Sequence, residues 1–329
     1  MTALTLRDRR VVVLGATGFI GRWVARSASA AGARVWLVAR NAAAAEKIAA
    51  DYSISGTIAE IDVTKPEDLQ ALMRDVQPAV TFNLAGYGVD RRETDEEMAA
   101  AINSELVARL IELVSIHVDH SWPGLRLLHA GSALEYGAVG GRLAEDAGAT
   151  PTTVYGRTKL AATRMIEAAV AEGKTRAATA RLFTVYGPGE HDGRLLPSIL
   201  AARGGSAPVQ MTDGYQRRDF TYVGDVAEGF IRAVTSGPPD RPTVNLATGR
   251  LHTVREFVAF AESALEIPRG CFEFGALPTR PDEMAHAEVT VDRARRWLGW
   301  VPDTEIAEGV RVTAQFLADI AGRTKSLAS

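Results

Sequence analysis

Tyr155 and Lys159 stand four residues apart, a spacing that places both side chains on one face of a helix. A phenol beside an ammonium can act as an acid or a base, because a nearby positive charge lowers its ordinary pKa of about 10. Ser132, which follows an apolar run at 125–130, could hydrogen-bond the same substrate oxygen as negative charge develops on it. These three side chains predict proton transfer coupled to the reduction of a carbonyl or the oxidation of an alcohol.

A glycine-rich loop with the spacing G-x-x-G-x-x-G follows the apolar run Val11–Leu14, and a helical pattern, Ile20–Ala31, begins at its end. Glycines let the backbone turn sharply and approach a pyrophosphate, which binds to the main-chain N–H groups at the helix N-terminus. This order of strand, loop and helix predicts a dinucleotide site. The expected cofactor-binding residues of the loop are Gly15, Thr17, Gly18, Phe19, Ile20 and Gly21.

The elements that must position these residues alternate regularly over the first half of the chain. Short β-branched runs without a polar face predict buried strands, each followed by a segment with helical spacing, which is typical of a parallel sheet covered on both sides. The expected strands are Val11–Leu14, Arg34–Val38, Thr57–Ile61, Ala79–Leu84, Leu125–Ala130 and Ala177–Phe183. The expected helices are Ile20–Ala31, Ala42–Asp51, Pro66–Val76, Asp95–Val118 and Thr153–Glu172.

The sequence changes in character after Gly187, where glycine and proline become frequent and strand patterns become fewer. The predicted fold class is therefore α/β: a Rossmann-type, doubly wound parallel sheet with a smaller, mostly C-terminal substrate-binding part. We place the dinucleotide-binding domain at 1–186, with later segments near 220–262 packing back on it. The mainly substrate-binding part is placed at 187–329.

The composition is that of a globular protein: 329 residues, of which 47% are hydrophobic and 23% charged. The net charge is -3 and there is no basic block, so nothing favours binding to nucleic acid or to an anionic membrane. A single cysteine, Cys271, fits a reducing compartment, and no apolar stretch approaches the ~18 residues needed to cross a bilayer. These observations predict a cytoplasmic protein. The histidines lack the spacing of metal ligands, so no metal site is expected.

Further segments follow one another in a fixed order along the chain. They are Asn83–Gly86, Gly131–Gly137 around Ser132, Arg181–Gly189, Arg218–Ala227, Arg280–Asp282 and Leu298–Pro302. With these segments the sequence resembles, over nearly its whole length, the extended branch of the short-chain dehydrogenase/reductase superfamily, which comprises NAD(P)-dependent nucleotide-sugar epimerases, dehydratases and reductases. The resemblance implies that Ser132, Tyr155 and Lys159 are catalytic, and that Tyr155 and Lys159 also contact the nicotinamide end of the cofactor.

The resemblance also implies how the rest of the cofactor is held. The residues it assigns are Asp62 and Val63 beside the adenine ring, Leu84, Ala85 and Gly86 at the fourth strand, and Asn103, which would brace the active site. The second strand ends without the carboxylate that reads a ribose 2′-hydroxyl. Arg40 stands there instead, and its guanidinium suits a 2′-phosphate, with Arg22 as a second candidate. NADP(H) is therefore favoured over NAD(H).

In sugar-nucleotide relatives, arginines at the positions of Arg218 and Arg280 clamp the substrate diphosphate. An acidic chain needs such local groups to hold two phosphates; the alternative is a structural salt bridge of Arg218 with Asp219 or Asp225. A further substrate contact falls on Thr184, where the family usually has asparagine, and a hydroxyl makes only part of an amide's hydrogen bonds. The implied partner is a nucleotide diphosphate sugar.

The positions after Ser132 narrow the reaction. Dehydratase and decarboxylase relatives carry carboxylates there, whereas this chain has Ala133 and Leu134, which cannot move protons. Glu135 comes next, but adjacent positions of a strand face opposite sides, so we expect it to be oriented differently. Elimination and decarboxylation are therefore disfavoured.

Several functions stay open. The end of the second strand favours reduction of a 4-keto-6-deoxy nucleotide sugar by NADPH, with Tyr155 as proton donor, over 4-epimerisation with tightly bound NAD. The motifs also fit a non-sugar carbonyl reductase or a noncatalytic dinucleotide-binding protein, and the intact triad disfavours the last. The long helices at 95–118 and 153–172 would suit the four-helix bundle through which family members often dimerise, so a homodimer is expected.

Overall fold

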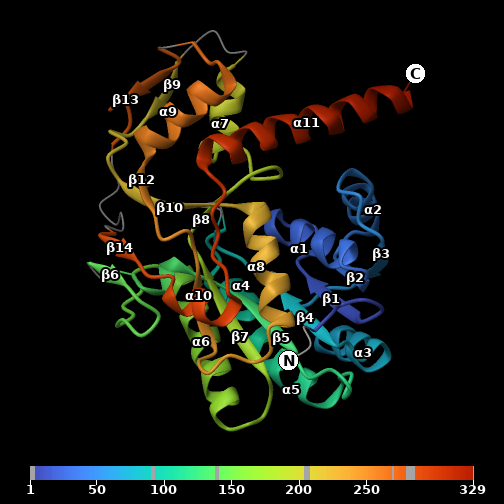
Figure 1. The fold of residues 1–329 in the computed structure, drawn as a ribbon. Coiled ribbons are helices and arrows are strands. Elements are labelled where there is room, and N and C mark those ends of the chain that lie inside the picture. The colour runs from blue at the N-terminus through green and yellow to red at the C-terminus, as the bar shows by residue number, and fades with distance from the viewer. Residues whose placement is uncertain are drawn as a thin grey trace.

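The computed structural model describes residues 4–89, 93–137, 141–203, 208–268, 270–278 and 286–328 of the chain. Figure 1 shows a central sheet with helices around it in the lower part of the view, and smaller sheets with further helices above it. The long C-terminal helix α11 (Ile306–Ala328) runs from this upper part toward the right of the view, where the chain ends.

The central sheet has seven strands in the order β3-β2-β1-β4-β5-β7-β11, and all neighbours in it are parallel. The strands are β1 (Arg10–Leu14), β2 (Arg34–Ala39), β3 (Gly56–Glu60), β4 (Val80–Asn83), β5 (Leu127–Ser132), β7 (Ala177–Leu182) and β11 (Thr243–Leu246). The direction of strand addition reverses between β1 and β4, which is where ligands bind in open α/β sheets. The predicted Rossmann-type fold is confirmed.

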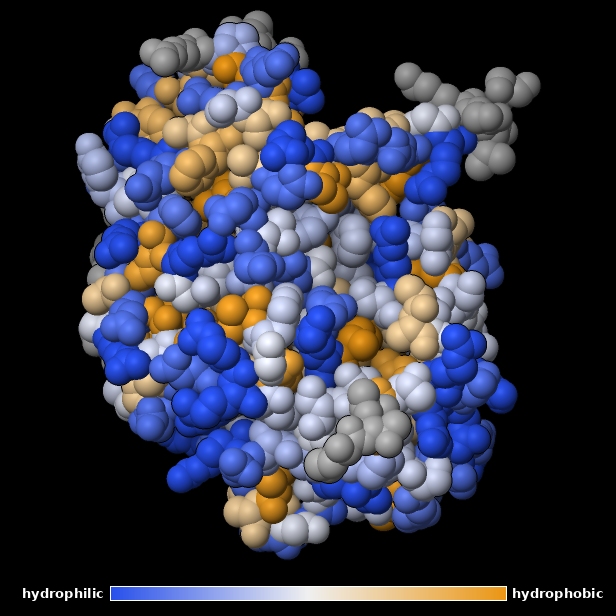
Figure 2. All heavy atoms as spheres, viewed as in Figure 1, coloured by the Kyte–Doolittle hydropathy of each residue, from blue (hydrophilic) through white to orange (hydrophobic). Residues whose placement is uncertain are grey.

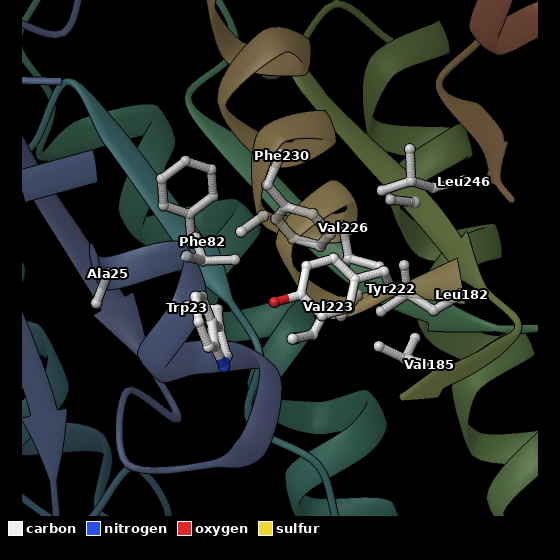
Figure 3. Packing of buried hydrophobic residues seen from close by; sticks show 14 of the residues in the cluster. Trp23, Ala25, Phe82, Leu182, Val185, Tyr222, Val223, Val226, Phe230 and Leu246 are labelled. Atoms are coloured by element: carbon white, nitrogen blue, oxygen red, sulfur yellow. The ribbon is translucent and has the colours of Figure 1, made fainter. Parts of the chain in front are cut away.

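Helices cover both faces of this sheet. One face carries α1 (Phe19–Ala30), α2 (Ala42–Asp51) and α8 (Val223–Thr235), and the other carries α3 (Pro66–Val76), α5 (Leu106–Ile116) and α6 (Val154–Ala171). On the first face Phe82 of β4 packs against Phe230 of α8, with ring centroids 6.0 Å apart (Figure 3). Strands with an apolar side chain on both faces need such double cover, since either face left open would expose them to water.

The helical segment after β4 is not one unbroken α-helix over Asp95–Val118, as the sequence predicted. A short helix, α4 (Glu96–Ala100), leads into a π-helical turn, Ala101–Glu105, and then into α5. The turn carries Asn103, whose side chain is fully buried and hydrogen-bonded outside the helix. Single π turns of this kind often mark functional positions in helices.

The remaining strands form three smaller sheets, and further helices accompany them. The strands are β8 (Thr184–Tyr186), β10 (Arg217–Tyr222) and β12 (Leu251–Thr253) in one sheet, β9 (Val209–Met211) with β13 (Phe272–Phe274), and β6 (Arg142–Leu143) with β14 (Glu288–Val289). The helices are α7 (Leu195–Ala202), α9 (Val254–Leu265), α10 (Asp292–Leu298) and α11. Since α8 and β11 join the first sheet, the chain crosses between the two parts more than once. The division at residue 186 stays a prediction.

The surface in the view of Figure 2 is hydrophilic over most of its area, with apolar residues in small groups between the polar ones. Among the helices that the structure describes, none combines the length and apolar character that crossing a membrane requires.

Candidate active site

The glycine loop lies at the carboxyl end of β1, beside the end of β4. Gly15 has a φ of +73°, and a Cβ there would lie 2.7 Å from the carbonyl carbon of Leu84. A Cβ on Gly21 would lie 2.0 Å from the carbonyl oxygen of Gly15. Any side chain at either position would push the loop away from β4 or from α1. Glycine at these two positions therefore allows the tight turn and the close packing of strand and helix that a dinucleotide-binding loop has.

The first turn of α1 follows Gly18, which gives no side-chain cap to it, so main-chain N–H groups face the loop. Thr17, Phe19 and Ile20 are partly exposed around this turn. Arg22 donates through Nε to the carbonyl of Gly18 (3.0 Å) and through Nη2 to that of Thr17 (2.6 Å). Arg22 therefore stabilises the glycine loop itself through these two hydrogen bonds. Arg40 stays the main candidate for binding a 2′-phosphate.

Arg40 is exposed just beyond the end of β2, and Asp62 follows β3 at the same edge of the sheet. Hydrogen bonds from the Thr64 N–H and hydroxyl lower the pKa of Asp62, and the charge of Arg40 lowers it further. Val63 lies next to Asp62, and its carbonyl accepts from Arg109 (3.4 Å). The residues predicted for the adenosine end of the cofactor thus lie beside one another.

The predicted triad comes together at the carboxyl end of β5. Ser132 is the last residue of that strand, and Tyr155 and Lys159 lie one turn apart on α6. Ser132 is close enough to the Tyr155 phenol to lower its pKa, and the Lys159 ammonium lies 5.8 Å from the centre of the Tyr155 ring. Lys159 is only 2% exposed and donates to the carbonyls of Ala130 (3.0 Å) and Ala85 (3.5 Å).

Burial is the largest cause of the pKa shifts of both Tyr155 and Lys159 on α6. It lowers the pKa of Lys159 to about 8, against the opposing charge of Glu135. It raises the pKa of Tyr155 above its ordinary value, and Glu135 raises it further, while the hydrogen bond with Ser132 and the charge of Arg194 lower it. The lowered pKa was expected from Lys159 together with an oxidised nicotinamide ring. In the protein alone burial outweighs such an effect and the phenol keeps its proton, as donation to a carbonyl requires.

Asn103 links three segments around the triad. Its Oδ1 accepts from the Tyr87 N–H (3.0 Å), and its Nδ2 donates to the Tyr87 carbonyl (2.8 Å) and to the Thr158 hydroxyl (3.0 Å). Thr158 is the residue before Lys159, and Tyr87 follows the Leu84–Gly86 segment. A Cβ on Gly86 would lie 3.6 Å from the Lys159 ammonium, so this segment passes directly over the site.

Glu135 departs from the strand geometry on which its predicted orientation rested. Ala133–Glu135 forms a 3-10 turn capped by Ser132, so the alternation of a strand does not apply there. The side chain is fully buried and accepts a hydrogen bond from the Ser132 N–H at 2.8 Å. Its ion pair with Arg181 is also 2.8 Å long. The strand alternation from which its orientation was predicted was therefore wrong for this residue. The carboxylate lies in the interior, where it binds the Ser132 N–H and Arg181.

The predicted substrate residues lie on the smaller sheet. Thr184 begins β8 and is paired with Phe220 of β10, while Arg218 lies on β10 two residues earlier. Burial and the charge of Arg218 lower the pKa of His286 to about 4, so these two side chains are close. Arg280 lies outside the described residues.

The carboxylates considered as salt-bridge partners of Arg218 accept other hydrogen bonds. Asp219 accepts from the main-chain N–H groups of Thr248 (3.0 Å) and Gly249 (2.7 Å). Asp225 accepts from the N–H (2.9 Å) and hydroxyl (2.7 Å) of Thr304. Both acids thus hold the backbone of neighbouring segments in place.

Three residues with ionisable side chains, in the segments after β4 and β8, were missed in the sequence. The charge of Glu93 raises the pKa of Tyr155 and that of Arg194 lowers it, so both face the site. Glu190 lies 3.7 Å from Arg194 with a side chain that is 6% exposed, and its Oε2 has no hydrogen-bond partner in the described part of the chain. Gly187 and Gly189 marked a turn in this region, but no spacing distinguished the residues beyond it from an ordinary loop.

Comparisons with known proteins identify the family of this chain. The family model "NAD dependent epimerase/dehydratase family" matches residues 11–247. A dTDP-6-deoxy-L-talose 4-dehydrogenase (NAD(P)(+)) from Kitasatospora kifunensis is 32% identical, over 98% of this chain and 100% of the relative. A probable dTDP-4,6-dihydroxy-2-methyloxan-3-one 4-ketoreductase from Streptomyces antibioticus is 30% identical, over 68% of this chain and 66% of the relative. The solved structure of MoeE5 in complex with UDP-glucuronic acid and NAD is 27% identical with a TM-score of 0.76, covering 94% of this chain and 99% of that one.

The chain therefore belongs to the NAD dependent epimerase/dehydratase family. It is an NAD(P)-dependent enzyme of the extended short-chain dehydrogenase/reductase type, as the resemblance in its motifs predicted.

The buried carboxyl of Glu190 predicts a pH-dependent stability. Burial raises its pKa from 4.5 to about 7, so the folded state favours the protonated form. That contribution is fully present below pH 4.5 and is lost as the pH rises through about 7. Glu190→Gln, which resembles the protonated form, should therefore raise the free energy of unfolding above pH 7, by up to about 3 kcal/mol. Urea unfolding at pH 5 and pH 8 measures this difference.

The exposed pair partner Glu228 provides the control, because Glu228→Gln should change stability little at either pH. An equal gain for Glu190→Gln at both pH values would contradict the role of the buried charge.

Proposed function

We propose that this enzyme transfers a hydride between NADP(H) and C4 of a 6-deoxy sugar carried on a nucleoside diphosphate, and that it reduces the 4-keto form. The observation that carries the proposal is the meeting of Ser132, the Tyr155 phenol and the buried Lys159 ammonium at the carboxyl end of β5. The similarity to a 6-deoxy-sugar 4-dehydrogenase and to a 4-ketoreductase supports it, because dehydrogenase and reductase are two directions of one reaction.

A bound NADPH would supply the hydride for C4 in this reaction. Tyr155 donates its proton to the carbonyl oxygen, and Ser132 donates a hydrogen bond to that oxygen as negative charge develops on it. Lys159, with a pKa of about 8, is positively charged at neutral pH and stabilises the phenolate that Tyr155 becomes. Two of its N–H groups are bound to main-chain carbonyls, and the third is assigned to the hydroxyls of the nicotinamide ribose.

The residues that follow Ser132 support a hydride transfer that is not followed by elimination of a group from the sugar. Ala133 and Leu134 carry no acid or base, and Glu135 is paired with Arg181 in the interior. A hydride transferred to C4 would then end as an alcohol, or return to the opposite face of the same carbon in an epimerase.

The exposed Arg40 supports the preference for NADP(H), because it follows β2 at the position that meets the adenosine ribose in this fold. Arg218, with Arg280, is assigned to the substrate diphosphate, and Thr184 to the sugar. The single cysteine supports the further expectation of a cytoplasmic enzyme, and the packing of α5 along α6 supports a homodimer through these helices.

Replacing Tyr155 tests the proton donor. Tyr155→Phe keeps the ring and removes the acidic proton, so turnover of a 4-keto-6-deoxy nucleotide sugar should fall by about 10²–10⁴-fold. Binding of NADPH, followed by fluorescence in the same preparation, should be retained. A variant with nearly normal turnover would exclude Tyr155 from the mechanism.

Replacing Arg40 tests the cofactor preference. A hydrogen bond to a charged group contributes ~1.5–3 kcal/mol, so Arg40→Ala should weaken NADPH binding by roughly ten- to a hundredfold and leave NADH nearly unchanged. Arg34→Ala, at the opposite end of β2, is the matched control and should affect neither cofactor. Equal losses for both cofactors would show that Arg40 does not read the 2′-phosphate, and NAD retained through purification would favour 4-epimerisation.

Replacing Arg218 tests the substrate class. Its contact with a diphosphate would be present in both ground and transition states, so Arg218→Ala should raise KM for the nucleotide sugar by about one to two decades with kcat roughly intact. Arg217→Ala on the same strand is the control and should leave KM unchanged. If a small ketone is reduced as efficiently as any nucleotide sugar, and Arg218→Ala affects neither, the enzyme is a general carbonyl reductase.

A further inference from the structure

Glu135 is a fully buried carboxylate whose oxygens are both bound. Oε1 accepts from the Ser132 main-chain N–H (2.8 Å), and Oε2 accepts from the Thr163 hydroxyl (2.9 Å) and from Nε of Arg181 (2.8 Å). A Cβ on Gly131 would lie 2.5 Å from Oε1, so the glycine before Ser132 makes room for this carboxylate. The surrounding residues thus provide both the space and the hydrogen-bond donors for the Glu135 carboxylate.

The partners of Glu135 belong to the segments that carry the triad. Ser132 is itself a member, and the bond to its N–H fixes the main chain where β5 turns into the 3-10 turn. Thr163 lies on α6 four residues after Lys159 and eight after Tyr155, on the same face of the helix. One carboxylate thus ties the end of β5 to the helix that must hold the phenol opposite Ser132.

Arg181 of β7 pairs with this carboxylate in the interior. Its side chain is 4% exposed, donates to the Glu145 carbonyl (3.2 Å) and lies 4.6 Å from the centre of the Tyr136 ring. An unpaired buried carboxylate would take up a proton or destabilise the fold, whereas a paired and fully hydrogen-bonded one can stay ionised.

We propose that Glu135 is a positioning residue for the catalytic triad: its carboxylate, paired with Arg181, joins Ser132 to α6 through Thr163 and so sets the placement of Ser132 against Tyr155. The proposal rests on the proposed function, in which Ser132 and Tyr155 serve one substrate oxygen.

The same charge acts on the protons of the site. Glu135 raises the pKa of both Tyr155 and Lys159, and Glu93 acts on Tyr155 in the same sense, while Arg194 opposes it. His129, beneath Lys159, has a pKa lowered by burial and by that ammonium, so it is uncharged at neutral pH. Glu135 thereby favours a protonated phenol beside a protonated amine, the state from which a proton is donated to a carbonyl oxygen.

Two variants separate this role from a contribution to folding alone. Glu135→Leu combined with Arg181→Met removes both charges together, which buried ion pairs often tolerate. Thr163→Val removes only the hydroxyl that ties α6 to Glu135, and it leaves the charge in place. The control is Glu167→Gln, also on α6, whose carboxylate accepts from the Thr243 hydroxyl (2.6 Å) and has no contact with Ser132.

The paired variant should lower kcat about tenfold to a hundredfold, as a small misplacement of catalytic groups does, with KM and NADPH affinity nearly unchanged. The reduction rate, which needs a protonated Tyr155, should also begin to fall at a lower pH than in the wild type. Thr163→Val should lower kcat with an unchanged pH profile, and Glu167→Gln should change neither. Wild-type kcat and pH profile in both the paired variant and Thr163→Val would overturn the proposal.

A measurement without substrate separates this proposal from the proposed reaction. With tyrosine labelled by carbon-13 at Cζ, the resonance missing from Tyr155→Phe reports ionisation of the Tyr155 phenol. It should begin to titrate at lower pH in the paired variant than in the wild type, and an unchanged titration would contradict the action of Glu135 on this phenol. If the titration moves but the wild type turns over no nucleotide sugar, the proposed reaction fails while the effect of Glu135 on Tyr155 stands.

Discussion

The burial of one ammonium group constrains the architecture of the site. Lys159 is almost completely shielded from water, so its N–H groups need acceptors within the protein. They find them in the carbonyls of Ala85 and Ala130, which stand at the carboxyl ends of β4 and β5. The helix α6 must therefore lie across these two strand ends. That position brings Tyr155, one turn earlier, to Ser132, where β5 ends.

Burial of the ammonium has an electrostatic cost that the rest of the site offsets. A fully buried lysine tends to lose its proton, and here the pKa falls to about 8, which still leaves the group charged at neutral pH. The acid that opposes the fall is Glu135, which is itself paired with Arg181. Positive Lys159, the carboxylate of Glu135 and positive Arg181 therefore follow one another from the candidate active site into the core. The phenol of Tyr155 keeps its proton because burial and the charge of Glu135 both raise its pKa.

The sequence allowed the fold and the triad to be predicted because both depend on local patterns. Buried strands show as β-branched runs, and the ends of α2 and α3 coincide with the predicted residues 42–51 and 66–76. The π turn at Asn103 could not be predicted, since it depends on hydrogen bonds to Tyr87, sixteen residues away. The 3-10 turn at Glu135 depends similarly on Arg181 and Thr163. Helical periodicity and strand alternation contain no information about such distant partners.

The loop after β8 shows how the two parts of the chain act as one body. Trp23 of α1 donates to the Pro188 carbonyl (2.8 Å), so the loop with Glu190 and Arg194 is attached directly to the helix that follows the glycine loop. The Trp23 ring also packs against Phe316 of α11, with centroids 5.1 Å apart. Helix α1 is thereby fixed both to the loop after β8 and to the C-terminal helix. Since the charge of Arg194 in this loop acts on Tyr155, a displacement of α1 would reach Tyr155 through the packing of this loop.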